Sequence, residues 1–227
     1  MSASGQRTTV FRFKIKGVTP LILHADSVEW ADQMAAWKND PQNKEASVAG
    51  DDRTPAFRWI GCVVTDGTSW VLPNENLSAC LMKAAARVLM PGGRGKKTFK
   101  EESMSGMSID GVGLPLAVKG KPLLKTLLQS LEKENDFSRH QSACRALGVE
   151  LFVKRASVGS SKHIRVRPKL DTWSCEGTVS VWDNRLAASL PQIFEIAGRQ
   201  IGLGDWRPSS PRKPGPYGRF DVEITKV

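Results

Sequence analysis

The chain has 227 residues, a length that suits one elaborated domain or two small ones. A hydrophobic content of 40% and seven tryptophans allow a substantial core, but no apolar run approaches the ~18 residues that span a bilayer. Thirty-three Lys and Arg residues against 23 Asp and Glu residues give a net charge of +10, which favours a polyanionic partner. The alternative is a basic protein without such a partner.

The N-terminal sequence MSASGQRTTV lacks the apolar segment of a secretory signal. The four cysteines, at positions 62, 80, 144 and 175, are widely spaced and form no C-x-x-C pair. This pattern supports neither a metal site nor a disulfide framework. We therefore expect reduced, mostly buried thiols in a cytoplasmic protein that has no metal, cofactor or membrane contact.

The first half of the chain predicts a strand, a polar insertion, a hairpin and a helix. Residues 9–17 alternate Val, Phe and Ile with Arg and Lys, which is typical of a strand with one basic face. Residues 29–52 are polar, with a weak helical pattern that ends in a loop. Residues 57–73 predict a hairpin with its turn at Asp66 and Gly67. Residues 77–89 carry apolar side chains at helical spacing and predict an amphipathic helix.

The middle of the chain predicts a flap, two helices and an extended arm. Residues 90–113 are rich in Gly, Lys and Ser and predict a long exposed loop. Leucines spaced over residues 123–131 predict one helix, and residues 136–148 predict a second, from an Asp cap to a Gly stop. Residues 149–170 read as a hairpin or arm whose second limb alternates apolar with basic side chains.

The C-terminal part predicts a strand over residues 177–182 and an amphipathic helix over residues 186–197. A glycine-rich and proline-rich loop follows, and residues 219–227 predict a closing strand. The strongest elements give the order β-α-β-β-α-β, so the sequence predicts an α+β fold with a ferredoxin-like or RRM-like core. We expect a single RRM-like domain over residues 1–227, with insertions at about 29–56 and 90–148.

Two glycine-rich segments resemble cofactor loops but lack their requirements. GLGDWR, from Gly202, has Arg207 in place of the third glycine and follows a helix, whereas the dinucleotide motif follows a strand. PGGRGKKT lacks the first glycine and the Ser or Thr of a nucleotide-triphosphate loop, with Met90 and Lys97 at those positions. We therefore interpret both segments as loops without a cofactor, the second of them flexible and strongly cationic.

Catalytic patterns are sparse. His24, His140 and His163 are scattered, and no G-x-S-x-G or H-E-x-x-H motif is present. The acidic clusters at residues 26–32 and 51–52 are interpreted as solvated patches. One alternative stays open, in which Asp26 with His24 assists RNA cleavage.

The basic residues form four clusters with aromatic side chains nearby, the combination that sequence-tolerant binding of single strands requires. The clusters lie on the first strand, in the flap, on the arm and in the terminal loop. The candidate nucleic-acid-binding residues are Lys14, Lys16, Arg94, Lys96, Lys97, Arg155, Lys162, His163, Arg165, Arg167, Trp206, Arg207, Arg212, Lys213, Tyr217 and Arg219.

Three segments of the chain resemble the RAMP superfamily, and in particular the repeated backbone subunit of CRISPR effector complexes, the Cas-seven group. They are FKIKGVTPLILH, WVLPNENLSACLMKAA and IGLGDWRPSSPRKPGPYGRFDVEI, which correspond to a first strand, a strand-turn-helix and a glycine-rich loop before the last strand. The resemblance covers about a quarter of the chain and leaves residues 90–150 unaligned. It implies an RRM-like core, a thumb-like arm and head-to-tail assembly along single-stranded RNA.

We therefore expect a non-enzymatic protein that binds single-stranded nucleic acid, RNA in preference to DNA, and forms a homo-oligomer or filament, with CRISPR effector subunits as further partners. It is expected to be a CRISPR subunit or a stand-alone or virus-borne relative. Two alternatives are an interaction protein that mimics a CRISPR backbone subunit and inhibits the complex, and an RNA endonuclease. Phosphate contacts and stacking do not distinguish RNA from DNA.

Overall fold

The computed structural model describes residues 8–44, 46, 48–92, 95–158 and 161–227. Helices and strands are mixed along the chain, and the strands form three sheets whose paired strands run antiparallel. This confirms the α+β class. Among the described helices, none has the length and apolar character needed to cross a bilayer.

The largest sheet brings together the two ends of the described chain. Its order is β12 (Phe220–Lys226), β1 (Thr9–Gly17), β11 (Trp173–Val181), β7 (Ala117–Val118) and β8 (Lys121–Pro122), and β5 (Met107–Ile109) also pairs with β11. Phe13 lies opposite Gly177 on one side and Ile224 on the other. Alternate residues of β1 are buried, as a strand with one core face requires.

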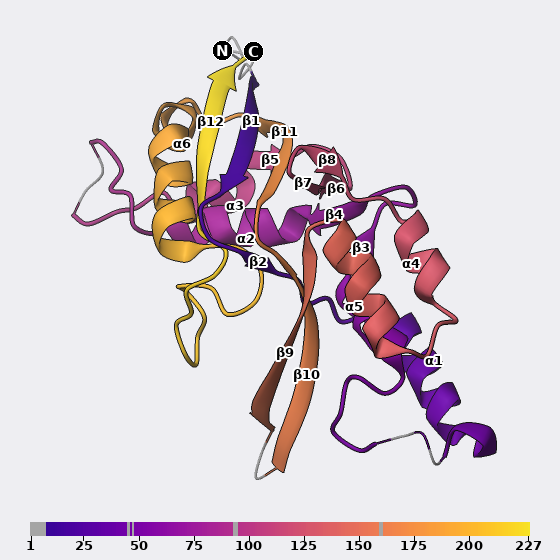
Figure 1. The fold of residues 1–227 in the computed structure, drawn as a ribbon. Helices are drawn as coiled ribbons and strands as arrows, with labels where there is room; N and C mark the ends of the chain where they lie inside the picture. Colours follow the sequence, from indigo (N-terminus) through magenta and orange to yellow (C-terminus); the bar gives the residue numbers. More distant parts are fainter. Residues whose placement is uncertain (1–7, 45, 47, 93–94, 159–160) are drawn as a thin grey trace.

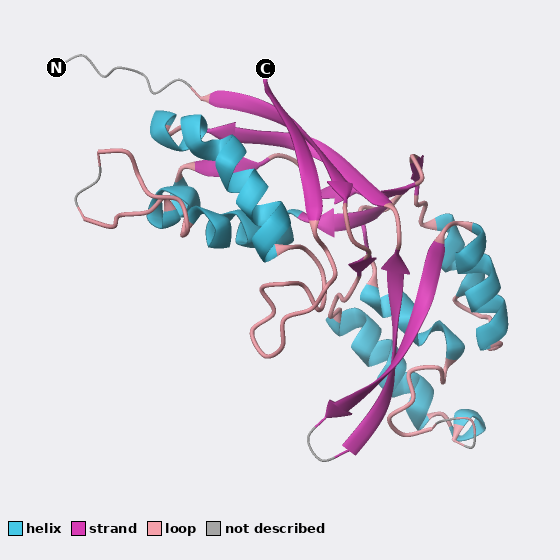
Figure 2. Ribbon diagram, turned by 60° about the vertical axis from the view of Figure 1, so that its left-hand side comes forward, coloured by secondary structure: helices cyan, strands magenta, loops and turns pink. Residues whose placement is uncertain are grey.

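Three helices cover one face of this sheet, as Figures 1 and 2 show: α2 (Asn74–Ala85), α3 (Lys100–Ser105) and α6 (Asn184–Ile196). The rings of Phe13 and Phe194 meet at 5.3 Å between centroids, which joins the sheet to α6. The Asp183 carboxylate caps α6 by accepting hydrogen bonds from the backbone N–H groups of Arg185 and Leu186. On the opposite face, which we call the open face, Arg12, Lys14 and Lys16 of β1 are exposed.

A second group of elements packs beside the main sheet. A small sheet contains β3 (Val64–Thr65), β4 (Trp70–Pro73) and β6 (Gly113–Pro115). The helices here are α1 (Val28–Asn39), α4 (Thr126–Leu131), α5 (Phe137–Ala146) and the 3₁₀ turns η1 (Pro41–Asn43) and η2 (Ala56–Cys62). The fully buried His140 holds α5 against η2, since its Nδ1 accepts from Trp59 Nε1 at 3.0 Å and its Nε2 donates to the Glu134 carbonyl at 2.8 Å.

The arm is formed by β9 (Val149–Val158) and β10 (Ser161–Leu170), with β2 (Leu21–Ile22) pairing at its base. It projects from the rest of the molecule (Figure 1). The terminal loop, residues 202–219, lies beside the arm and leads directly into β12. The arm and the loop expected from the sequence are thus confirmed, together with α6 and the closing strand.

Two local expectations are wrong. Residues 57–62 form part of a 3₁₀ helix where a strand was predicted, because a short apolar run that buries Trp59 and Ile60 fits either structure. The segment 90–113 is not one long exposed loop, since it contains α3 and β5. Phe99 is completely buried and Ile109 nearly so, and these two anchors outweigh the glycines and lysines around them.

Candidate nucleic-acid interface

One face of the arm carries most of its cations. Because opposite residues of an antiparallel pair share a face, Lys154 lies beside Arg165, and Phe152 lies beside Arg167. Leu151 and Val166 lie on the other face of the arm and are buried in the core. The residues on the face of Lys154 and Arg165 therefore point to the opposite side of the arm. We call this set the inward face of the arm: Glu150, Phe152, Lys154, Ala156, His163, Arg165, Arg167 and Lys169.

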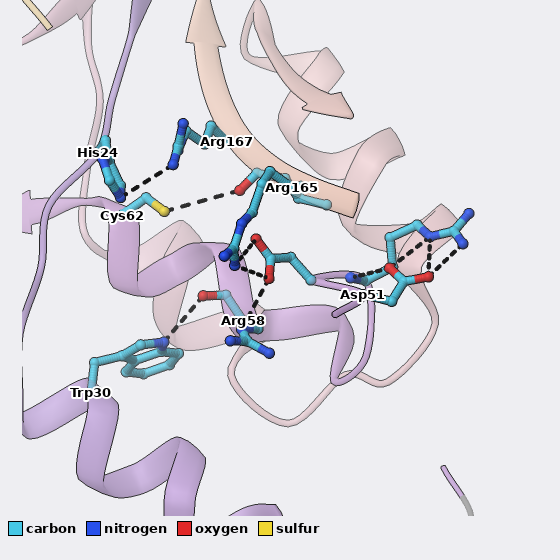
Figure 3. A network of polar contacts seen from close by, with 10 residues as sticks. His24, Trp30, Asp51, Arg58, Cys62, Arg165 and Arg167 are labelled. Atoms are coloured by element: carbon cyan, nitrogen blue, oxygen red, sulfur yellow. Dashed lines mark hydrogen bonds and ion pairs between the residues drawn. The ribbon is translucent and has the colours of Figure 1, made fainter. Parts of the chain in front are cut away.

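The first ion pair on the inward face centres on a buried carboxylate, that of Asp52. Arg165 Nη1 donates to Asp52 Oδ1 at 3.0 Å, and Arg58 Nε lies 3.3 Å from the same oxygen (Figure 3). Asp52 is 8% exposed. One buried carboxylate therefore holds two guanidinium groups together, and the pairing ties β10 to η2.

The second ion pair joins the arm to the terminal loop. Arg167 Nη1 donates to Asp205 Oδ2 in a short contact, and Arg167 Nη2 lies 3.3 Å from His24 Nε2. Figure 3 shows His24 and Arg167 pointing toward each other, with Cys62 between their elements. The side chain of Asp205 is one-third exposed. This pair is more open to solvent than the one at Asp52.

Two cavities meet at this second pair and form one groove. The first, of about 380 Å³, lies between α2 and residues 201–207; the second, of about 730 Å³, lies between α1, η2 and the arm. Both are lined by His24, Ala25, Asp26 and Cys62. Arg165 and Arg167 line the second cavity, and Asp205 and Arg207 line the first. We call this combined space the groove.

The groove lowers the basicity of one histidine and the acidity of one thiol. The pKa of His24 lies below its ordinary value because burial disfavours the charged ring and Arg167 repels it, although the carboxylates of Asp205 and Asp26 favour the charged ring. Burial raises the pKa of Cys62 to about 11, so this thiol is protonated at neutral pH. The other three cysteines also carry free thiols and are buried, as expected.

The terminal loop contacts the inward face through aromatic rings. The ammonium of Lys154 lies 2.9 Å from the Trp206 ring centroid. Tyr217 packs between Trp206, at 5.6 Å, and Phe152, at 6.1 Å, measured between ring centroids. A Cβ atom on Gly215 would lie 1.8 Å from the Trp206 carbonyl oxygen, so only glycine permits this close approach.

Lys154 is also close to a second cation of the terminal loop. Its pKa is lowered by burial and then by repulsion from Lys213, with a partial offset from Asp205. Arg212 and Lys213 are exposed at the tip of the loop. The loop therefore adds positive charge next to the arm without burying it.

Several predicted residues lie away from the groove. Arg155 and Lys162 are exposed on the opposite face of the arm. The flap projects past α6, away from the arm (Figure 1); Lys96 is exposed there, and Lys97 pairs with Glu102 at 2.9 Å. Arg94 falls outside the described residues.

Lys14 and Lys16 stand on the open face of the main sheet among carboxylates. Lys14 lies in register with Glu176 on β11 and with Glu223 on β12. Lys16 Nζ forms an ion pair with Glu223 Oε1 at 2.5 Å. The sequence pattern showed the basic face of one strand, whereas the acidic residues that flank it come from its neighbours in the sheet.

The remaining basic residues of the terminal loop hold its backbone. Arg207 Nη1 donates to the Gly204 carbonyl at 2.7 Å and also lines the first cavity. Arg219 Nε donates to the Arg199 carbonyl at 3.2 Å. Trp206 is half-buried, whereas Trp173, another tryptophan near the basic clusters in the sequence, is buried.

Sequence reasoning missed the carboxylates that complete the groove. Asp52 was assigned to a solvated patch, and Asp205 was read only as part of a glycine-rich loop. Their partners are 113 and 38 residues away along the chain, so no local pattern connects them. Within the described ranges, no cluster of three His, Cys, Asp or Glu side chains could hold a metal ion.

Comparison with protein-family models gave no match, and comparison with curated proteins gave no match either.

Proposed function

We propose that this protein binds single-stranded nucleic acid in the groove between the arm, α1 and the terminal loop. The observation that carries the proposal is the inward face of the arm, where Arg165 and Arg167 line the second cavity and Lys154 shares their side of the hairpin. Cations along such a track suit a phosphate backbone. An isolated solvated face would need no cavity beneath it.

The terminal loop supplies the second half of this chemistry. Arg212 and Lys213 are exposed cations of the loop that also carries Trp206 and Tyr217, and Lys213 lies close enough to Lys154 to repel it. Aromatic rings beside a cationic track favour stacking of unpaired bases, which is tolerant of sequence. RNA and DNA both fit this description, and contacts to the 2′-hydroxyl would separate them.

We also propose that the main sheet and its helices form a ferredoxin-like core. The order β12, β1, β11, β5, with α2 between β1 and β5 and α6 between β11 and β12, supports a ferredoxin-like core. The arm and the loop before the last strand support the resemblance to the RAMP superfamily. Assembly along a strand follows from that resemblance and is tested by electron microscopy with and without an oligonucleotide.

Charge reversal in the terminal loop tests the proposed interface. We expect Arg212→Glu with Lys213→Glu to weaken binding of short fluorescent oligouridylate and oligothymidylate at every salt concentration, and to reduce the salt slope by about two. The matched control is Arg12→Glu with Lys226→Glu, which changes the net charge by the same amount at exposed positions on the main sheet. Fluorescence anisotropy measures both.

Equal weakening in the two double variants would refute a local site and leave only non-specific attraction. No binding by the wild type at low salt would favour the rival class, an interaction protein that recognises another protein without nucleic acid.

A further inference from the structure

The Arg167 guanidinium already holds an anion in the free protein. One of its terminal nitrogens donates to Asp205, and the other faces His24 Nε2 at 3.3 Å. All three residues stand where the two cavities meet, since His24 lines both. A guanidinium presents a fork of donors that fits a carboxylate and a phosphate equally well.

We propose that Arg167 and His24 form a phosphate subsite of the groove, and that Asp205 occupies this subsite until a strand displaces it. The inference rests on the proposed function. The ligand is one phosphodiester group of the bound strand. Asp205 is thus an internal competitor that weakens binding.

Asp52 shows what a structural carboxylate looks like in the same groove. Its side chain is 12% exposed and contacts two arginines, Arg58 and Arg165. Asp205 has a one-third exposed side chain, and Arg167 is its partner among the described ion pairs. Removing Asp52 would leave two cations facing each other, whereas removing Asp205 leaves one cation that water and phosphate can reach.

The terminal loop keeps its place without the Asp205 carboxylate. The backbone N–H of Asp205 donates to the Ile22 carbonyl at 2.9 Å. Leu203 N–H donates to the Gly218 carbonyl at 2.9 Å, and Gly218 N–H donates to the Pro20 carbonyl at 2.8 Å. These bonds fix both ends of the loop to the chain around β2. The Asp205 carboxylate can therefore leave Arg167 while the loop stays folded.

The test compares two carboxamide substitutions. Asp205→Asn keeps the shape of the side chain and removes its charge. Glu195→Gln is the matched control, because Glu195 is an exposed carboxylate on α6, outside the groove, that pairs with Arg199 at 2.9 Å. Both variants gain one unit of net charge. Thermal melting of each confirms that it is folded, and Asp205→Ser replaces Asp205→Asn if that variant is not.

We expect Asp205→Asn to bind short single strands about tenfold more tightly than the wild type at low salt, because a like charge beside the phosphate is removed. Its salt slope should steepen by about one, as for one more phosphate contact. Glu195→Gln should change the affinity less than about twofold. In the double variant Arg167→Ala with Asp205→Asn, the gain should vanish.

An Asp205→Asn affinity equal to or below that of Glu195→Gln, with a wild type that binds through Arg212 and Lys213, would overturn this inference alone. A gain that persists without Arg167 would also overturn it, since the competitor would act elsewhere. No binding by wild type and Asp205→Asn alike would overturn the proposed function together with this inference.

Discussion

Lys154 on the arm places its ammonium 2.9 Å from the centroid of the Trp206 ring in the terminal loop. The two residues are 52 positions apart in the sequence, and their contact joins the inward face of the arm to the loop beside it. A cation held on an indole face is favourable by about 0.5 to 2 kcal/mol, depending on how far it is desolvated. The contact places a cation and an aromatic ring side by side where the arm meets the terminal loop.

Replacement of Trp206 distinguishes the contribution of base stacking to single-strand affinity from that of charge. We expect Trp206→Ala to weaken single-strand binding about tenfold, because one base loses its stacking partner, while the salt slope stays within error of the wild type. Trp206→Phe should retain most of the affinity. Anisotropy titrations over a range of salt provide both quantities. A Trp206→Ala protein that binds like the wild type would remove this ring from the site.

The two groove carboxylates should differ in their effect on stability. Asp52→Ala is expected to lower the free energy of unfolding by about 3 kcal/mol, since it leaves Arg58 and Arg165 close together and poorly hydrated. Asp205→Asn should cost less than about 1 kcal/mol, because its ion pair is partly exposed. Urea denaturation measures both. Equal losses would show that burial does not distinguish the two pairs.

The elements with strong periodicity could be predicted from the sequence, and the long-range partners could not. The spacing of Leu77, Leu81 and Ala84 predicted α2, and the turn residues Asp66 and Gly67 predicted the β3–β4 hairpin. Residues 57–62 were assigned wrongly because a short apolar run fits strand and 3₁₀ helix alike.

In the groove, too, the face of the strand could be predicted from the sequence, and the long-range partners could not. The alternation on β10 correctly placed Arg165 and Arg167 on one face. Their partners Asp52 and Asp205 depend on how η2 and the terminal loop pack against the arm, which no local pattern encodes. The prediction that Lys14 and Lys16 contact nucleic acid stays untested, although the sheet surrounds them with carboxylates.

His140 should matter for stability and leave binding intact. His140→Ala is expected to lower the free energy of unfolding by about 3 kcal/mol, because it opens a cavity and leaves the buried Trp59 N–H without its acceptor. Single-strand affinity should be unchanged at a temperature where the variant is folded. Denaturation and anisotropy on one sample test this. A folded variant that has lost binding would contradict a purely structural role.

The depressed pKa of His24 predicts two opposite effects of acid. The unfolded chain takes up a proton more readily than the folded one, so the contribution of His24 to stability is complete above pH 6.5 and is lost as the pH falls below it. Phosphate beside His24 would favour the charged ring, so single-strand affinity should rise over the same interval. Titrations from about pH 8 to pH 5.5 measure both trends.

His24→Asn is the matched variant for this prediction, and His163→Asn controls for a second histidine on the arm. The acid-induced gain in affinity should be absent in the first variant and present in the second. An unchanged pH profile in His24→Asn would show that another group is responsible.

The central claim is that a single strand lies in the groove, and photochemical cross-linking with mapping of the attached peptides tests it most directly. Short strands that carry 4-thiouridine or 5-iododeoxyuridine are irradiated with the wild-type protein. We predict attachment at His24 in the groove and at Trp206 and Tyr217 in the terminal loop beside it, and loss of these adducts in Arg212→Glu with Lys213→Glu. Attachment confined to the open face of the main sheet, around Lys14, or to the flap would contradict it.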